Sequence, residues 1–202
     1  MGKIFRSAMP IGYFLICMLA PTVRPAYSGE VTEQLRVSVD QIIEILSNGD
    51  LKAPEKEAER RAAIRRIVDQ VFDWEEMARR SLARHWKDRT SEEKERFTAL
   101  FSQLLERTYI SKIERYEDEK VLYGEEKIDN GYGVLKTSIA SAKGASIPVE
   151  YRLRHKNSRW LVYDVVVEGV SLVNNYRTQF AKMLQSGNYE ELVRRLEEKV
   201  KG

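Results

Sequence analysis

Residues Trp160–Phe180 read WLVYDVVVEGVSLVNNYRTQF, and this stretch decides what fold we expect. The part before Gly169 is apolar on both faces except for Asp164 and, at its exit, Glu168, which predicts a β-strand covered on both sides. After Gly169 the spacing changes to that of an amphipathic helix. The apolar side of this helix carries Val173, Tyr176, Phe180 and Leu184. The stretch therefore predicts a buried strand that leads into a packed helix.

Four helices are expected before the strands. Apolar residues recur at helical spacing over 31–46 and again in the charged segment 54–72. Asp73 and Thr90 each have a glutamate three residues later, the capping-box pattern that starts a helix. The helix that begins at Thr90 is long and extends to about Tyr116.

The apolar period changes to two from residue 121. Turn residues at 130–131, 143–144 and 157–158 separate four strand-like runs, which predict an antiparallel meander. A last break at 187–188 precedes a final helix. The expected fold class is α+β, with helices packed against one curved antiparallel sheet of about four strands.

Two blocks of residues carry a resemblance to a known family. The run 164–180 is similar to the D-V-x-V-x-G-V-S-L-V-x-N-Y-R-x-Q-F pattern of the toluene-tolerance, MlaC-type family of periplasmic phospholipid-binding proteins. The second block, 72–80, leads to Trp86 and Thr90 as it does in that family. The family usually has Gly where this chain has Ala83, which we interpret as a small-for-small change on a helix with little consequence.

The resemblance implies a carrier rather than an enzyme. Such a carrier shields the acyl chains of a phospholipid in an apolar cavity between helices and sheet, and the lipid is cargo rather than a cofactor. It exchanges this cargo with an outer-membrane lipoprotein and porin complex and with an inner-membrane ABC transporter that carries an MCE domain. The process maintains the lipid asymmetry of the outer membrane.

The resemblance also suggests which residues line the cavity. The sheet would contribute its dry face, which is the face that carries the apolar side chains, and the long helix would contribute one of its sides. These residues are Val149, Tyr151, Leu153, Tyr163, Val165, Val167, Phe101, Leu105 and Tyr109. Periodicity alone does not distinguish such a lining from a filled core. Asn174 and Arg177 are candidates for the pocket mouth, where Arg177 could pair with a phosphate, or could instead bond Asp164 or a helix end.

The first 28 residues have the pattern of a cleaved signal peptide. Lys3 and Arg6 precede the apolar run 11–20, and small residues suggest cleavage after Ser28. An uncleaved anchor is the alternative, but the run is shorter than the about 20 residues that a span needs. The prediction is a periplasmic protein with a single phospholipid-binding domain over 29–202.

Charge and cysteine content exclude some functions of that domain. The 34 basic residues include three in the leader, so the domain carries 31 against 31 acidic residues and has no basic surface typical of nucleic-acid binding. The single cysteine, Cys17, lies in the leader, which removes disulfides and thiolate metal ligands.

Two alternatives to a carrier stay open. One is a pocket enzyme of the α+β type, for which Asp164 would be a buried base. However, Asp73 is better explained as a helix cap, and His85 and His155 lack metal-ligand spacing. The other is an envelope protein that binds other proteins through its sheet edge or a helical face.

Overall fold

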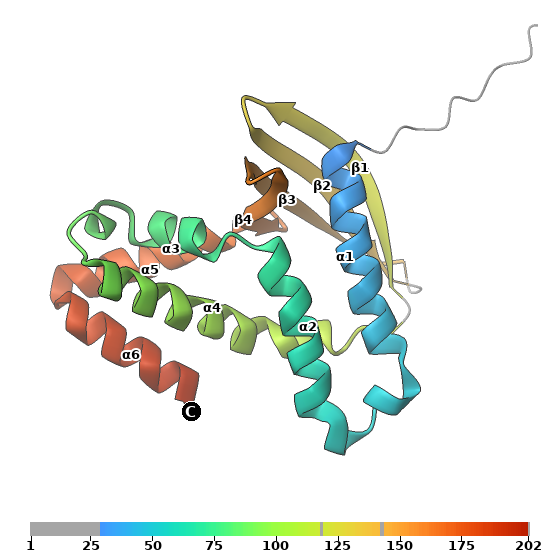
Figure 1. The fold of residues 1–202 in the computed structure, drawn as a ribbon, viewed down its shortest axis with the longest axis horizontal. Helices are drawn as coiled ribbons and strands as arrows, with labels where there is room; N and C mark the ends of the chain where they lie inside the picture. The colour runs from blue at the N-terminus through green and yellow to red at the C-terminus, as the bar shows by residue number, and fades with distance from the viewer. Residues whose placement is uncertain (1–28, 118, 142–143, 202) are drawn as a thin grey trace, which may run out of the picture.

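The computed structural model describes residues 29–117, 119–141 and 144–201 (Figure 1). The elements are α1 Glu30–Ser47, α2 Glu57–Val71, α3 Trp74–Leu82, α4 Ser91–Ile113, β1 Lys120–Asp129, β2 Tyr132–Ala140, β3 Ser146–Lys156, β4 Arg159–Val167, β5 Val170–Ser171, α5 Leu172–Ser186 and α6 Tyr189–Lys201. Short 3-10 turns lie at Gly49–Leu51, Pro54–Lys56 and Ala83–Trp86. The α+β class is confirmed, and the expected signal peptide with its cleavage site lies outside the described residues.

The strands form one antiparallel meander in the order β1-β2-β3-β4-β5. The two-residue strand β5 adds to the four strands expected from the sequence. Two-residue turns join β1 to β2 and β3 to β4, and both central residues of each turn have positive φ, as at Asn130 and Gly131. Such turns match the twist of the strands and fix the register of the hairpins.

The two faces of the sheet are covered by different helices. On one face, Val31 and Leu35 of α1 and Val71 of α2 pack against buried residues of β2 to β4. We call this the α1 face. On the other, Arg154 of β3 bonds side chains of α3. We call this the α3 face.

A β-bulge in the β3–β4 pair decides which side chains of β4 lie on which face. Arg152 pairs with Asp164 and Leu153 with Val162, so Tyr163 has no partner across the ladder. Residues paired in a ladder share a face, and successive residues alternate. The bulge therefore places Tyr163 on the α3 face, opposite Val165. The prediction that Tyr163 shares the dry face with Val165 is wrong, because a run of apolar residues gives no sign of an inserted residue.

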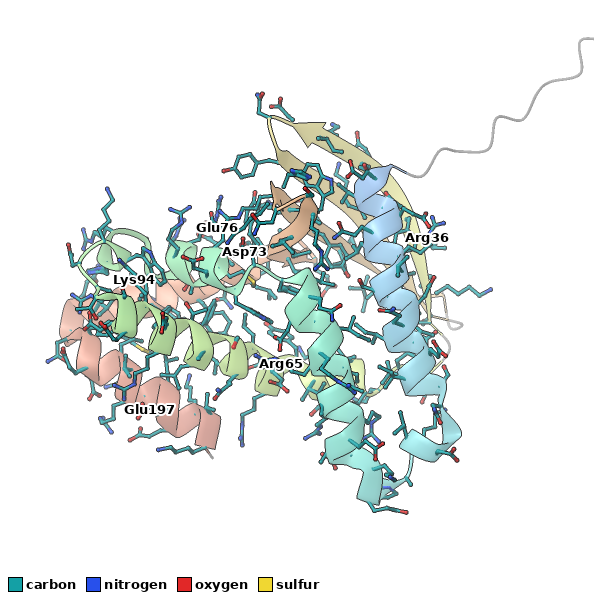
Figure 2. The ribbon with its side chains drawn as sticks, in the orientation of Figure 1. Arg36, Arg65, Asp73, Glu76, Lys94 and Glu197 are labelled. Atoms are coloured by element: carbon teal, nitrogen blue, oxygen red, sulfur yellow. The ribbon has the colours of Figure 1, made fainter. Side chains whose placement is uncertain are left out.

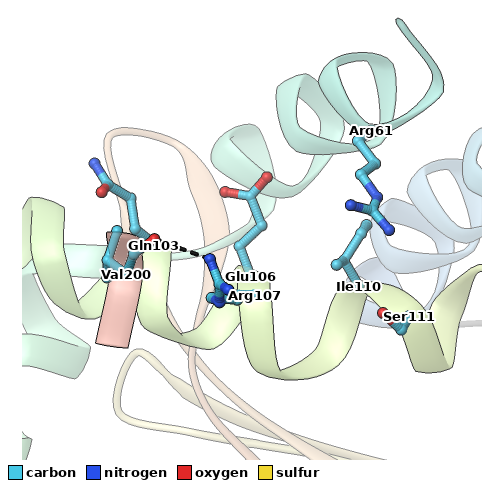
Figure 3. A pocket seen from close by; sticks show the side chains of 7 residues that line it. All are labelled: Arg61, Gln103, Glu106, Arg107, Ile110, Ser111 and Val200. Atoms are coloured by element: carbon cyan, nitrogen blue, oxygen red, sulfur yellow. Dashed lines mark hydrogen bonds between the residues drawn. The ribbon is translucent and has the colours of Figure 1, made fainter. Parts of the chain in front are cut away.

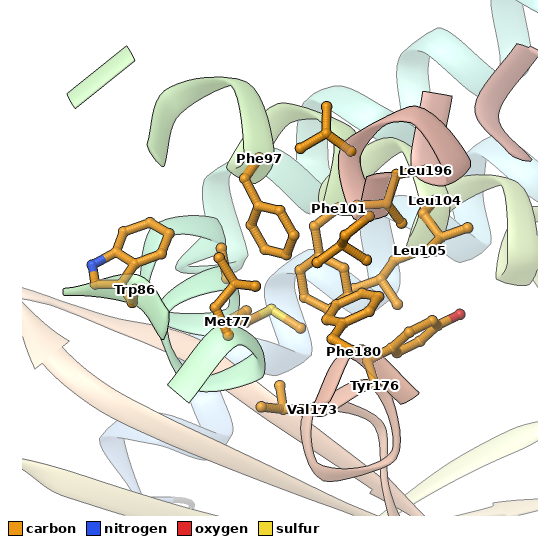
Figure 4. Close-up of a cluster of buried hydrophobic side chains, with 14 of the residues drawn as sticks. Met77, Trp86, Phe97, Phe101, Leu104, Leu105, Val173, Tyr176, Phe180 and Leu196 are labelled. Carbon is orange, nitrogen blue, oxygen red and sulfur yellow. The ribbon is translucent and has the colours of Figure 1, made fainter. Parts of the chain in front are cut away.

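Helices α3 to α6 form a separate core around aromatic rings (Figures 1 and 4). Phe101 is 0% exposed and contacts Tyr176 and Phe180 edge to face, with ring centroids 5.3 and 5.7 Å apart. We call this cluster the helical core. The buried side chains on the α1 face form a second cluster, which we call the sheet core.

The helix starts at Asp73 and Thr90 are confirmed. Thr90 and Glu93 form both bonds of a capping box, at 3.2 and 2.8 Å. The Asp73 carboxylate accepts from the backbone N–H of Glu76 at 3.1 Å, but the Glu76 carboxylate bonds arginines instead of closing a box.

Ala83 does not continue the helix, contrary to our interpretation. Helix α3 ends at Leu82, and Ala83 has φ 50° and ψ −121°. L-residues rarely adopt this conformation, whereas glycine adopts it freely. The alanine methyl group therefore introduces backbone strain at this position.

Candidate functional site

The structure brings together some of the predicted lining residues but not all. The residues on the α1 face, in or against the sheet core, are Val149, Tyr151, Leu153, Val165 and Val167. Phe101 and Leu105 instead lie in the helical core, and Tyr109 packs against it. Tyr163 lies on the α3 face, where the Arg80 guanidinium stacks 4.0 Å from its ring. The candidate site is therefore centred on the α1 face rather than between the sheet and α4.

Helix α1 is fixed to this face at its N-terminus by β1. The Glu126 carboxylate accepts hydrogen bonds from the backbone N–H and the hydroxyl of Thr32, at 2.8 and 2.5 Å. A carboxylate is favoured there because the positive end of the helix dipole lies at the N-terminus. Gly29 permits this approach, since a Cβ at that position would lie 2.0 Å from Glu126. Sequence reasoning missed this contact, because a cap supplied from a distant strand leaves no local pattern.

A second contact holds α1 against β4. The side-chain amide of Gln34 donates to the carbonyl of Trp160 at 2.6 Å and accepts from its N–H at 3.0 Å. This reciprocal pair of hydrogen bonds gives partners to two backbone groups of β4 that would otherwise lack them. Together with Glu126, it seats the N-terminal half of α1 across the sheet.

Beside these anchors lies a group of large apolar side chains that are only half-buried. They pack against the sheet core and come from α1, α2, the residue after α2, the four strands β1 to β4 and the start of α5. Among them are Val39, Ile67, Phe72, Tyr123, Tyr151 and Val167. We call this group the half-buried wall. These side chains keep accessible surface at the margin of the sheet core, so they have contact surface to offer.

Two tyrosines of the half-buried wall are strongly desolvated. Burial raises the pKa of Tyr151 to about 12, although its side chain keeps accessible surface. Burial, followed by the charge of Asp40 and the nearby Tyr151, raises the pKa of Tyr123 to about 12. The Tyr123 hydroxyl is buried and has no hydrogen-bond partner.

The α3 face carries a charge cluster that ties α3 to the sheet (Figure 2). Glu76 is 3% exposed and bonds Arg79 at 2.6 Å, Arg80 at 2.7 Å and Arg154 at 3.1 Å. Arg154 also bonds Asp73 at 2.6 Å. Burial by itself would raise the pKa of Glu76, but the arginine hydrogen bonds and the charge of Arg154 outweigh it and lower the pKa. Asp73 is therefore part of a structural junction as well as a helix cap.

Asp164 and the predicted pocket mouth also have structural partners. The Asp164 carboxylate accepts from the Ser171 hydroxyl at 2.6 Å and from the Val173 N–H at 3.1 Å, so it caps the start of α5. Arg177 bonds neither Asp164 nor a helix end. Its guanidinium donates to Asn174 at 2.5 Å, and both side chains are exposed on α5.

A surface pocket of about 520 Å³ lies between α2, α4 and the end of α6 (Figure 3). It is lined by Arg61, Gln103, Glu106, Arg107, Ile110, Ser111 and Val200. Only two of these side chains are aliphatic, and Arg107 already donates to the Val200 carbonyl at 3.0 Å. The pocket offers polar contacts and is a poor environment for hydrocarbon.

Within the described part of the chain, no group of three or more His, Cys, Asp and Glu side chains is arranged to hold a metal ion. No helix in the same residues has the length and hydropathy to cross a membrane. His155 is exposed and its ring meets Trp160 edge to face at 5.1 Å.

Comparisons with known proteins agree with the fold and with the two sequence blocks. The sequence model of the MlaC protein family matches residues 36–198. The intermembrane phospholipid transport system binding protein MlaC of Haemophilus influenzae is 25% identical over 122 residues, which are 58% of this chain and 57% of that protein. The chain thus spans little more than half the length of this relative.

A second relative and a solved structure extend the match. The toluene tolerance protein ttg2D of Pseudomonas putida is 25% identical over 182 residues, covering 86% of this chain and 79% of that protein. A phospholipid-binding protein from Ralstonia solanacearum, solved in complex with a phospholipid, has a TM-score of 0.73 at 23% identity and covers 85% of this chain and 97% of its own. The family match alone spans most of the chain, and the chain therefore belongs to the MlaC protein family.

Proposed function

We propose that this protein is the phospholipid-binding component of a lipid transport system and that it encloses acyl chains against the half-buried wall. The proposal draws on membership of the MlaC family and on relatives described as phospholipid transport or phospholipid-binding proteins. The single observation in the structure that supports it most is the half-buried wall itself. It gathers large apolar side chains with spare contact surface beneath α1 and α2.

Physical chemistry explains why such a wall suits a lipid. Each buried methylene contributes about 0.8 kcal/mol to the binding free energy. Two acyl chains with about 30 methylenes in total therefore gain roughly 20 kcal/mol, before the loss of entropy and the reorganisation of the protein are subtracted. A lipid therefore leaves only when the enclosing elements move. The N-terminal half of α1 is anchored by Glu126 and Gln34, whereas Leu46 in its C-terminal half packs with Ile64 of α2. Movement of the α1–α2 hairpin away from the sheet would open the site.

The finer details of the proposal concern location and partners. The leader 1–28 would direct the protein to the periplasm, where the single domain 29–202 would bind the lipid. The cargo would pass between an outer-membrane lipoprotein and porin complex and an inner-membrane ABC transporter with an MCE domain. Asn174 and Arg177, exposed on α5, would lie at the mouth of the site.

Extraction of the purified protein tests the proposal. The chain is expressed with its own leader in a Gram-negative host, purified from the periplasmic fraction, and extracted with organic solvent for mass spectrometry. We expect close to stoichiometric phospholipid. A chemically altered lipid would point to an enzyme, and protein without any lipid would point to a protein-binding role, so both outcomes would contradict the carrier.

Substitutions of residues on the α1 face test whether the acyl chains bind there. Val149→Trp and Val165→Trp should fill the space intended for acyl chains, so that co-purified phospholipid falls several-fold while the circular dichroism spectrum stays that of a folded protein. Val37→Trp is the matched control, because Val37 is 50% exposed on the outer side of α1. Undiminished lipid in the two folded variants would show that the site lies elsewhere.

A further inference from the structure

The Tyr123 hydroxyl is a polar group without a partner in the protein. It has no accessible surface and makes no hydrogen bond. Buried hydroxyl groups in native proteins almost always have a partner, and the desolvation of an unpaired one is unfavourable. Such a group in the wall of a binding site calls for a partner that arrives with the ligand.

The register of the sheet places Tyr123 in the candidate site. Tyr123 pairs with Thr137, and Thr137 pairs with Val149, so all three share the α1 face. Tyr151 lies on the same face two residues after Val149, and the two phenols are close enough to interact electrostatically. Both rings pack against the sheet core. The two hydroxyls are thus polar groups in an otherwise apolar wall.

Helix α1 supplies the charges around Tyr123. The Arg36 guanidinium stacks 4.9 Å from the centre of the ring, and Asp40 lies near the hydroxyl. The charges of Asp40 and Glu33 act against a further anion at this point, and the charge of Arg36 acts in the opposite direction. A phosphate is therefore disfavoured next to the Tyr123 hydroxyl, whereas a neutral carbonyl oxygen meets no repulsion.

We propose that Tyr123, with Tyr151 beside it, donates a hydrogen bond to an ester carbonyl of the bound glycerolipid and so fixes how deeply the acyl chains enter. This inference rests on the proposed function and adds the part of the ligand that is recognised. The ester carbonyls are the only strong acceptors between the acyl chains and the phosphate. A tyrosine that contacts these carbonyls selects for ester-linked lipids, while the headgroup stays in contact with solvent.

A pair of matched ligands tests the inference. A fluorescent acyl probe is displaced from delipidated protein by a diester phospholipid and by its diether analogue with the same headgroup and chain length. We expect the wild type to prefer the diester by about fivefold, the effect of one net hydrogen bond. Tyr123→Phe should bring the ratio close to one by weakening only the diester, and Tyr151→Phe should reduce it. Tyr132→Phe is the control, because Tyr132 is 48% exposed on the α3 face.

Diacylglycerol separates the ester from the phosphate as the acceptor. It keeps both ester carbonyls and has no phosphate, so Tyr123→Phe should weaken it about as much as the diester phospholipid. A Tyr123→Phe protein that keeps the wild-type ratio would overturn the inference, as would a diacylglycerol affinity that does not change. Failure of every lipid to displace the probe from the wild type would instead contradict the proposed function itself.

Discussion

The helical core and the sheet core bury similar kinds of apolar side chain but differ in whether their buried polar atoms have hydrogen-bond partners. In the helical core, rings from α4 and α5 meet edge to face, and Phe97, Phe101 and Phe180 are at most 2% exposed. In the sheet core, fully buried residues such as Leu135 and Val162 lie next to the half-buried Tyr123 and Tyr151. Both clusters have partly buried apolar side chains at their margins, but the Tyr123 hydroxyl and the Trp160 indole N–H, which are buried without a hydrogen-bond partner, both lie in or against the sheet core.

This difference assigns separate roles to two parts of one small domain. The helical core supplies stability and holds α3 against the sheet through the Glu76 charge cluster. The margin of the sheet core keeps partly buried apolar side chains and an unpaired hydroxyl, and we propose that a ligand gains the contacts that these groups offer. A carrier needs both properties, because it has to stay folded when its cargo leaves.

A pair of tyrosine truncations gives the largest expected effect. Tyr176 packs against Phe101 and Phe180 in the helical core, so Tyr176→Ala should reduce the free energy of unfolding by about 3–5 kcal/mol. Tyr151→Ala in the half-buried wall should reduce it by only about 1–2 kcal/mol, because one side of that ring has fewer contacts to lose. Urea unfolding of the delipidated proteins measures both values.

The same variants should respond to lipid in the opposite order. Saturating phospholipid should stabilise the Tyr176→Ala protein by as much as the wild type, and the Tyr151→Ala protein by less, because only the second variant changes the binding surface. Equal losses of stability without lipid would show that both clusters are filled to the same extent. The proposed division between the two cores would then be wrong.

The order of elements followed from periodicity and turn residues, because these signals are local. The capping box at Thr90, the hairpin turns and the strand that leads toward α5 were all found where the sequence predicts them. Five of the six sheet residues predicted to share one apolar face do so, since alternation along β3 is regular, but that face lies against α1 rather than the long helix, and their role as a lipid lining stays a prediction. Local spacing is enough wherever the chain keeps one period.

The features that were missed depend on contacts between distant segments or on the backbone. The bulge that moves Tyr163 to the α3 face interrupts a run of apolar residues in which no residue type marks the extra position. The Glu126 cap on α1 joins residues more than 90 positions apart. Phe101 and Leu105 were expected to face the sheet across a cavity but lie in the helical core, because helical periodicity identifies a buried side of a helix but not the element that covers it. Each of these facts requires the three-dimensional structure.

An acid titration probes the junction between the two regions. The pKa of Glu76 is lowered below its ordinary value of 4.5 in the folded protein, so the folded state releases this proton more readily than the unfolded state. The contribution of Glu76 to stability is therefore complete above about pH 4.5 and is lost as the pH falls through its folded pKa. At pH 7, Glu76→Gln should lower the free energy of unfolding by about 2 kcal/mol.

The difference between Glu76→Gln and the wild type should shrink as the pH falls below 4.5, in denaturant unfolding at a series of pH values. Glu44→Gln serves as a control with the same change of charge on the exposed side of α1. A constant difference down to the lowest pH at which the protein folds would mean that the Glu76 carboxylate does not hold α3 to the sheet as an anion.

The smallest expected effect is a gain in stability on the helical side. Ala83 has a positive φ at the end of α3, and relief of this strain by Ala83→Gly should exceed the added conformational entropy of glycine in the unfolded chain. We expect the free energy of unfolding to rise by about 1 kcal/mol, with the affinity for phospholipid unchanged, because α3 contributes to the helical core and not to the half-buried wall.

Ala62→Gly in the middle of α2 is the matched control and should destabilise by a similar amount, since Ala62 is exposed in a regular helix. A loss of stability in both variants would show that the turn after α3 carries no strain, and a change in lipid affinity in Ala83→Gly would show that the two cores are coupled through α3.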